Sequence, residues 1–230
     1  MIRVFTAFSG YDSQCMALDR LAARHDDFSY ELVGWSEIDK YAIQAHDALY
    51  PQAKDRNYGD ISKIDWSQVP DFDLFTYSFP CQSISNAGLQ HGFKEGSGTR
   101  SSLLWECKKA IEAKKPKYLL MENVKALVQR KFIGDFKTWL NWLASKGYSN
   151  YWTVMNAKDY GVPQNRERVF CVSILGDHDW YSFPLKHDEC GCINDIAEKK
   201  VDDKFYVSEK MVEGFNLHNV AHEAKGTGFK

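Results

Sequence analysis

Short apolar runs alternate with stretches of helical hydrophobic spacing along the first 176 residues of the chain. Apolar runs of this length predict β-strands, and apolar residues that recur every three or four positions predict amphipathic helices. The predicted strands cover residues 2–8, 30–36, 71–78, 117–121, 149–156 and 168–175. The predicted helices lie between them, at residues 13–24, 40–49, 101–113 and 132–146. This alternation predicts an α/β fold with a mostly parallel, twisted sheet and helices on both of its faces.

The pattern changes after residue 176. Residues 195–230 are mostly polar, and helical spacing returns only around 208–218. With 230 residues and a hydrophobic content of 44%, the chain is long enough to bury one sizeable core. We therefore predict one domain over residues 1–176 and a partial appendage over residues 177–230.

The charge balance does not by itself indicate a nucleic-acid partner. The net charge is −2 and the sequence pI is about 6.4, so any surface for an anionic polymer has to be a local basic patch. No apolar run approaches the roughly 18 residues that a membrane span requires. The N-terminus carries no secretory signal, and we expect a reducing, cytoplasmic setting. In that setting the cysteines are expected to be thiols without a structural metal site: Cys15, Cys81, Cys107, Cys171, Cys190 and Cys192.

Two segments carry candidate chemistry. Cys81 lies in Pro80-Cys81-Gln82 directly after a predicted strand, and Glu122 opens Glu122-Asn123-Val124 after another. A thiolate that adds to carbon 6 of cytosine turns the ring into a nucleophile at carbon 5. A carboxyl group that hydrogen-bonds or protonates N3 relieves the charge that builds on the ring. Each motif alone is short, and an inert buried thiol is the alternative interpretation of Cys81.

Two further segments complete a set of four motifs. Phe8-Ser9-Gly10 follows the first predicted strand, and Gln164-Asn165-Arg166-Glu167-Arg168 leads into the last. With the Pro-Cys-Gln and Glu-Asn-Val segments between them, the chain resembles the cytosine-5 DNA methyltransferase family of bacteria and phages. The resemblance covers residues 1–176 and implies a Rossmann-like, S-adenosylmethionine-dependent methyltransferase fold. It also implies methylation of cytosine in double-stranded DNA, as in restriction-modification, in the cytoplasm of a prokaryotic cell.

Cofactor binding is expected at the ends of three predicted strands. Gly10 lets the main chain approach a ligand closely, and Glu37 offers a carboxylate to ribose hydroxyls. After Gly10 the chain departs from the family pattern, because Tyr11-Asp12-Ser13 stand where further glycines are usual. A turn glycine and a surface acid are the plain alternatives for these two residues. The resemblance implies the following S-adenosylmethionine-binding residues: Phe8, Ser9, Gly10, Glu37, Ile38, Asp60, Ile61, Pro80 and Leu103.

DNA binding is expected from the motif segments and from the long loop at residues 82–101. In the family this loop closes over the DNA as the target base is flipped into the pocket. The resemblance implies that one of Arg166 and Arg168 grips the cytosine O2 and holds Glu122, while the other arginine supports the first. A surface ion pair with Glu167 or with Glu122 is the alternative for either arginine. The substrate-binding residues that the resemblance implies are Gln82, Ser83, Arg100, Asn123, Val124 and Gln164.

Members of the family normally continue with a variable target-recognition region, an arginine-containing segment and a final helix. Residues 177–230 resemble neither of the last two, so we expect them to be the start of the recognition region in a fragment. A split enzyme completed by a second chain and an inactive DNA- or cofactor-binding relic are the alternatives. A tRNA-methylating relative is a further alternative, although its usual Cys-Phe-Thr signature is absent. A thymidylate-synthase-like enzyme fits less well, because such enzymes lack the glycine turn and the Gln-x-Arg-x-Arg run.

Overall fold

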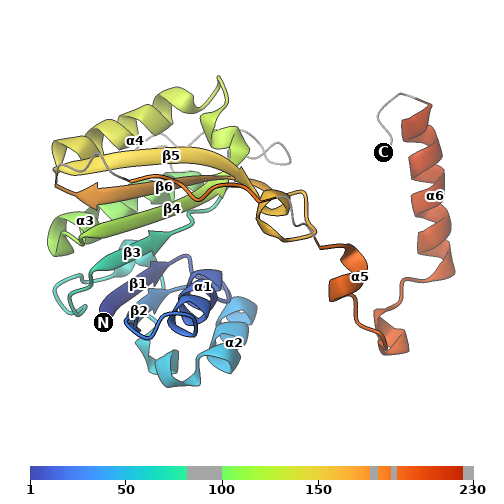
Figure 1. Cartoon of the computed structure of the whole chain (residues 1–230), viewed down its shortest axis with the longest axis horizontal. Helices are drawn as coiled ribbons and strands as arrows, with labels where there is room; N and C mark the ends of the chain where they lie inside the picture. Colours follow the sequence, from blue (N-terminus) through green and yellow to red (C-terminus); the bar gives the residue numbers. More distant parts are fainter. Residues whose placement is uncertain (82–99, 177–180, 188–190, 225–230) are drawn as a thin grey trace. The chain divides into compact units, whose positions relative to one another are not determined.

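The computed structural model describes residues 1–81, 100–176, 181–187 and 191–224. A six-stranded sheet forms the centre of the larger part of the chain (Figure 1). Its strand order is β2-β1-β3-β4-β6-β5. The strands are β1 (Ile2–Ala7), β2 (Tyr30–Ser36), β3 (Leu74–Tyr77), β4 (Tyr118–Val124), β5 (Tyr148–Asn156) and β6 (Glu167–Leu175).

The sheet is mostly parallel, as the sequence predicted. β1 pairs in parallel with β2 and with β3, and β3 pairs in parallel with β4. β6 runs antiparallel to both of its neighbours, β4 and β5. The first residues of β6 therefore lie at the same edge of the sheet as the last residues of β1 to β4. This edge receives all four sequence motifs.

Helices connect the strands where hydrophobic spacing predicts them. Asp12 and Asp39 are the N-caps of the first two helices. Their carboxylates accept hydrogen bonds from main-chain N–H groups of the first turn. The α-helices of this part are α1 (Ser13–Ala22), α2 (Lys40–Leu49), α3 (Cys107–Lys114) and α4 (Ile133–Ser145). Short 3-10 helices are η1 (Pro51–Arg56), η2 (Ile61–Lys63), η3 (Arg100–Glu106), η4 (Lys125–Val128) and η5 (Ala157–Tyr160).

Three boundaries differ from the sequence prediction by three residues or more. β3 begins at Leu74 instead of residue 71, and the helix predicted over 101–113 is a 3-10 helix through Glu106 before α3 begins. β4 continues through Val124, beyond its predicted end at residue 121. Buried and half-buried residues alternate along β4, so polar side chains interrupt the apolar run while the strand goes on.

Aromatic side chains fill the core between the sheet and α3 and α4. Phe5 of β1 and Phe75 of β3 are fully buried and pack in one cluster with Trp139 of α4. A smaller cluster around Trp35 lies on the side of α1 and η1. Val33 belongs to the larger cluster and Leu32 to the smaller one, and neighbouring residues of a strand point to opposite faces. Both faces of the sheet are therefore covered, as predicted.

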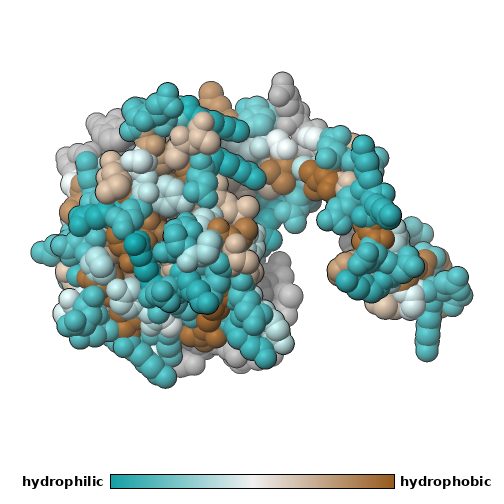
Figure 2. All heavy atoms as spheres, turned by 90° about the horizontal axis from the view of Figure 1, so that it is seen from below, coloured by the Kyte–Doolittle hydropathy of each residue, from teal (hydrophilic) through white to brown (hydrophobic). Residues whose placement is uncertain are grey.

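The chain divides into two compact units, Met1–Cys190 and Gly191–Lys230. The second unit contains α5 (Ile193–Ile196), η6 (Asp203–Phe205) and α6 (Glu209–Glu223), and large apolar side chains in it are exposed. Hydrophilic residues cover much of the visible face of the first unit, with scattered apolar ones between them (Figure 2). Among the residues described above, no helix combines the length and the apolar character needed to cross a membrane.

Candidate active site

Cys81 and Glu122 come from neighbouring parallel strands. Tyr77, the last residue of β3, lies opposite Met121 of β4. From Tyr77 the chain runs through residues 78–80 to Cys81, and Glu122 follows Met121 directly. Cys81 is a half-buried free thiol that packs against the main core. The sheet thus brings the predicted nucleophile and the predicted carboxyl group to the same edge.

Burial distinguishes Cys81 from the other described cysteines of the first unit. Cys15, Cys107 and Cys171 are buried. Desolvation raises the pKa of all three thiols, to about 12 for Cys171. Because the thiolate is the reactive form, these three residues are poor nucleophiles at neutral pH. Cys81 is therefore the described cysteine of this unit that combines access to solvent with a place at the motif-bearing edge.

Arg168 forms an ion pair with Glu122. Its Nε lies 2.9 Å from the Glu122 Oε1, and the two side chains are only 23% and 24% exposed. The antiparallel pairing of β4 with β6 sets Val124 opposite Arg168, and Glu122 points to the same face of the sheet as Val124. The long Arg168 side chain consequently reaches Glu122 from the next strand. This contact fixes the orientation of the Glu122 carboxylate.

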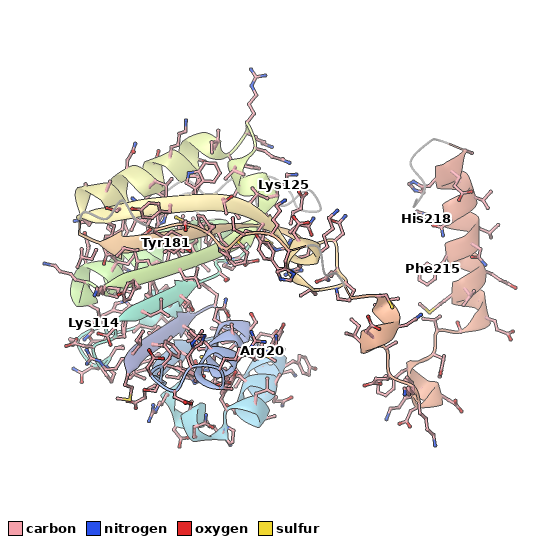
Figure 3. The ribbon with its side chains drawn as sticks, in the orientation of Figure 1. Arg20, Lys114, Lys125, Tyr181, Phe215 and His218 are labelled. Carbon is pink, nitrogen blue, oxygen red and sulfur yellow. The ribbon has the colours of Figure 1, made fainter. Side chains whose placement is uncertain are left out.

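The two arginines of the Gln-x-Arg-x-Arg run differ in their contacts. Glu167, which stands between them, pairs at 2.9 Å with Lys125. Lys125 lies just past the end of β4 (Figure 3). Arg166 is exposed, and its main-chain N–H donates to Asn156 Oδ1 at 3.0 Å. The sequence left open which glutamate each arginine faces. In the structure it is Arg168 that pairs with Glu122, while Glu167 is engaged by a lysine.

Asn123 ties the Cys81 segment to β4. Its side chain is 3% exposed, and its Nδ2 donates to the Phe79 carbonyl at 2.9 Å. Its Oδ1 accepts from the Val124 main-chain N–H, also at 2.9 Å. Both ends of the Asn123 amide are thus hydrogen-bonded within the protein. One of the partners, Phe79, lies two residues before Cys81 in the sequence. These contacts hold the segment that leads to Cys81 against β4. The direct substrate contact that the resemblance implies for Asn123 stays a prediction.

The first cofactor motif meets the end of β2. Gly10 has a φ of +58°, in the left-handed region that favours glycine, and a Cβ built on it would have no atom within 4 Å. Its N–H donates to Glu37 Oε2 at 2.9 Å. The other oxygen of Glu37 accepts from the N–H groups of Ile38 and Asp39 at 2.8 and 2.9 Å. Gly10 and Glu37, two predicted cofactor residues, therefore form one hydrogen-bonded unit beside open space.

Asn57 is a residue of this region that the sequence analysis did not single out. Its side chain accepts from the Glu37 N–H at 3.2 Å and donates to the Glu37 carbonyl at 3.2 Å. It also accepts from the Gly59 N–H at 2.9 Å, which joins the end of β2 to the segment before Asp60. Hydrogen bonds from the Ser62 hydroxyl and main-chain N–H lower the pKa of Asp60. An asparagine followed closely by a glycine was the available sequence signal for such a turn.

The remaining predicted cofactor residues differ in how far their side chains are buried. Ile38 is 70% exposed, whereas Ile61 is 3% exposed and belongs to the main core. Ser9 is buried, and its main-chain N–H donates to the Ser36 carbonyl at 3.2 Å. Half-buried side chains are those of Phe8, Pro80 and Leu103. An exposed Ile38 offers an apolar surface to a ligand, while Ile61 supports that region from within the core.

Part of the predicted substrate set lies outside the described residues. This holds for Gln82 and Ser83 and for the side chain of Arg100. Gln164 is exposed, and its main-chain N–H donates to the Val162 carbonyl at 2.7 Å.

The sequence matches the family described as C-5 cytosine-specific DNA methylase over residues 2–230. It is 41% identical to the Type II methyltransferase M2.ScrFI of Lactococcus lactis subsp. cremoris, over 92% of this chain and 72% of that protein. It is 36% identical to the Type II methyltransferase M.NlaX of Neisseria lactamica, over 84% of this chain and 60% of that protein. The orphan methyltransferase M.SPRI of Bacillus phage SPR is 37% identical, over 97% of this chain and 48% of that protein. The chain thus spans between about half and about three quarters of these relatives.

Solved methyltransferase structures share the fold. The S. pombe Dnmt2 methyltransferase has a TM-score of 0.71 at 20% identity, over 95% of this chain and 67% of that one. The Entamoeba histolytica methyltransferase EhMeth has a TM-score of 0.73 at 18% identity, over 92% of this chain and 64% of that one. These likenesses confirm the predicted Rossmann-like fold. The family match over nearly the whole length and the relative of 41% identity confirm what the four motifs predicted: the chain belongs to the C-5 cytosine-specific DNA methylase family.

Proposed function

We propose that this protein transfers a methyl group from S-adenosylmethionine to carbon 5 of cytosine in double-stranded DNA, with Cys81 as nucleophile. The observation that carries the proposal is the Arg168–Glu122 ion pair of 2.9 Å: Glu122 lies on β4, beside the strand that leads to Cys81, and Arg168 lies on β6, the next strand along. An isolated carboxylate at this edge would be free to rotate. A carboxylate held by an arginine is preorganised to meet one ring edge of a base.

In the proposed reaction the Cys81 thiolate adds to carbon 6 of the flipped-out cytosine. The ring electrons move toward N3, where Glu122 donates a proton or a hydrogen bond, and carbon 5 becomes nucleophilic. Carbon 5 then attacks the methyl carbon of the sulfonium, the carbon–sulfur bond breaks, and its electron pair stays on sulfur, so that S-adenosylhomocysteine leaves as a neutral thioether. A base removes the proton from carbon 5, the double bond between carbons 5 and 6 forms again, and Cys81 leaves as a thiolate. In this scheme Arg168 orients Glu122 and faces the cytosine O2, and Arg166 supports it from the surface.

The residues at the ends of β1 and β2 fit S-adenosylmethionine. Its bound form supplies an electrophilic methyl group on a sulfonium. Gly10 has no side chain, so a ligand can come close to its main chain. Ile38 offers an exposed apolar surface. Glu37 accepts three main-chain hydrogen bonds, and a carboxylate has about four acceptor sites, so one remains for a ribose hydroxyl.

DNA is the proposed partner, and a flipped base is required because carbon 6 of a stacked cytosine is out of reach. We assign Gln82, Ser83, Arg100 and Gln164 to DNA contacts on the strength of their motif positions. Residues 177–230 are proposed to be the start of a target-recognition region, after a catalytic and cofactor-binding domain over residues 1–176. The bacterial and phage origin of the relatives supports action in a prokaryotic cytoplasm.

The proposal is tested by mixing the protein with labelled S-adenosylmethionine and duplex DNA that contains 5-fluorocytosine. Fluorine at carbon 5 cannot leave as a proton does, so the adduct with Cys81 should persist as a labelled band that survives denaturation. Cys81→Ser should give no band, and an RNA duplex of the same sequence should give none. A protein that binds the cofactor yet forms no adduct with DNA, or forms it through another residue, would refute the proposal.

A further inference from the structure

Two strained residues flank the cofactor glycine. Among the residues that the structure describes, the non-glycine residues with positive φ are Phe8 at 56°, Asp12 at 66° and Lys115. Asp12 is also the N-cap of α1, although N-cap residues ordinarily take extended backbone angles. A non-glycine residue in the left-handed region costs about 1 kcal/mol or more unless its surroundings compensate. The turn that carries Gly10 therefore depends on whatever holds Asp12.

Buried contacts hold the Asp12 side chain. Its Oδ2 accepts from the Thr6 hydroxyl at 2.7 Å and lies 3.5 Å from His46 Nε2. Its Oδ1 accepts from the Cys15 main-chain N–H at 3.2 Å. Asp12, Thr6 and His46 are all 0% exposed, and the His46 ring stacks on Trp35 with centroids 3.6 Å apart. To cap α1, the Asp12 carboxylate needs only the hydrogen bond from the Cys15 N–H, and it need not be buried. Its contacts with Thr6 and His46 go beyond capping.

These contacts connect the two sides of the cofactor region. His46 lies on α2, the helix that begins directly after Glu37 and Ile38. The Asp12–His46 contact therefore links the turn after β1 to the last turn of α2, while the bond between Gly10 and Glu37 links the same turn to the segment just before that helix. The main-chain N–H of Asp12 also closes the turn, by donating to the Ser9 carbonyl at 2.8 Å.

We propose that Asp12 is a positioning residue for the cofactor site: through Thr6 and His46 it holds the turn at residues 9–12 in the form that presents Gly10 and Glu37. The proposal rests on the proposed function, because it assigns S-adenosylmethionine to that surface. It also explains how the chain manages without the further glycines expected after Gly10. A buried carboxylate takes over the task of keeping the left-handed conformation.

Asp12→Ala and Asp12→Asn test the proposal, with Asp19→Ala as the matched control. Asp19 lies two turns further along α1, and its carboxylate accepts from the hydroxyls of Tyr30 and Tyr50 at 2.6 and 3.2 Å. Both alanine variants remove a carboxylate with two side-chain partners from the same helix, so both should lower the denaturation midpoint. S-adenosylmethionine affinity is measured by calorimetry under conditions where each variant is folded. Hydrogen exchange of the peptide at residues 8–15 is measured without cofactor.

Asp12→Ala should weaken S-adenosylmethionine about tenfold or more and speed exchange of this peptide by a similar factor, because buried groups lose their acceptor. Asp12→Asn should stay within about threefold of wild type, since asparagine tolerates the left-handed region and keeps a side-chain acceptor. Asp19→Ala should leave affinity and exchange of this peptide unchanged. If Asp12→Ala behaves like Asp19→Ala, or if Asp12→Asn loses as much as Asp12→Ala, the proposal is overturned. A wild-type protein without cofactor affinity would instead refute the proposed function, while the exchange data still decide the role of Asp12.

Discussion

Removing the Arg168 side chain should impair catalysis far more than folding. Arg168→Ala breaks the 2.9 Å contact to Glu122 and leaves the carboxylate without the group that orients it. Arg168→Lys keeps the positive charge but loses the planar Nε donor that makes this contact. We expect the alanine variant to be the more severe of the two, because it removes both the charge and every donor that could still hold the Glu122 side chain.

The solvent exposure of the Arg168–Glu122 pair sets the expected loss of stability. Fully exposed ion pairs contribute about 0.2 to 1 kcal/mol, and breaking a buried pair costs about 3 to 5 kcal/mol. With both side chains about three quarters buried, Arg168→Ala should lower the free energy of unfolding by about 1 to 2 kcal/mol. A positioned acid contributes about 10² to 10⁴ in rate, so the alanine variant should slow methyl transfer about 10²-fold and Arg168→Lys about tenfold.

Single-turnover transfer of a labelled methyl group to DNA measures the rate, and urea unfolding measures stability. Glu167→Gln is the matched control, because it breaks the exposed Lys125 pair on the same strand and should change neither quantity much. Glu122→Gln combined with Arg168→Ala should be little worse than Glu122→Gln alone, since both act through one carboxyl group. If Arg168→Ala retains more than a third of the wild-type rate, or if the double variant shows the product of the single losses, Arg168 does not act through Glu122.

Three further outcomes are expected. Cys81→Ser should abolish the 5-fluorocytosine adduct and leave S-adenosylmethionine affinity unchanged by calorimetry, because Gly10 and Glu37 come from the ends of other strands and the substitution changes a single side-chain atom; retained turnover would exclude Cys81. Glu37→Ala should weaken the cofactor by about 1.5 to 3 kcal/mol and leave DNA affinity nearly unchanged; an unaltered cofactor titration would reduce Glu37 to a structural acid. Gly34→Ala should destabilise the fold by about 1 to 3 kcal/mol in urea unfolding, because its Cβ would lie 2.8 Å from ring carbons of Phe5 and Tyr58; a wild-type midpoint would contradict this packing.

The strands were predictable where large apolar residues cluster. The boundaries of β2 agree with the prediction because Leu32, Val33 and Trp35 lie within Tyr30–Ser36 and the acid Glu37 follows. The end of β4 was not predictable in this way. Glu122 points out of the core while Asn123 turns inward to bond the Phe79 carbonyl, and a buried polar residue of this kind has no hydrophobic signature. Tertiary hydrogen bonding, and not local propensity, carries the strand beyond Met121.

The identity of the site residues was predictable from motif order, but their pairing was not. Whether Arg166 or Arg168 meets Glu122 depends on the antiparallel register of β6 against β4: a shift of two residues would set Arg166 where Arg168 lies, and a shift of one would turn both arginines to the other face. Asp12 was read only as a departure from a glycine pattern. Its role depends on Thr6 and on His46, a residue 34 positions later (46 − 12), and no local pattern links them.

The strand order itself explains why one sheet edge suits methyl transfer between two bound molecules. Across the sheet, in the order β2-β1-β3-β4-β6, the edge carries Glu37, Gly10, Cys81, Glu122 and Arg168. Gly10 and Glu37, which we predict to bind the cofactor, thus lie on one side of β3, and the residues assigned to the cytosine lie on the other. A thiol after β3 is adjacent to both sets. Had β6 run parallel to β4, its Gln-x-Arg-x-Arg run would begin at the far edge of the sheet, and no arginine from it would reach the carboxylate. The reversal of a single strand is what completes the cytosine side of the site.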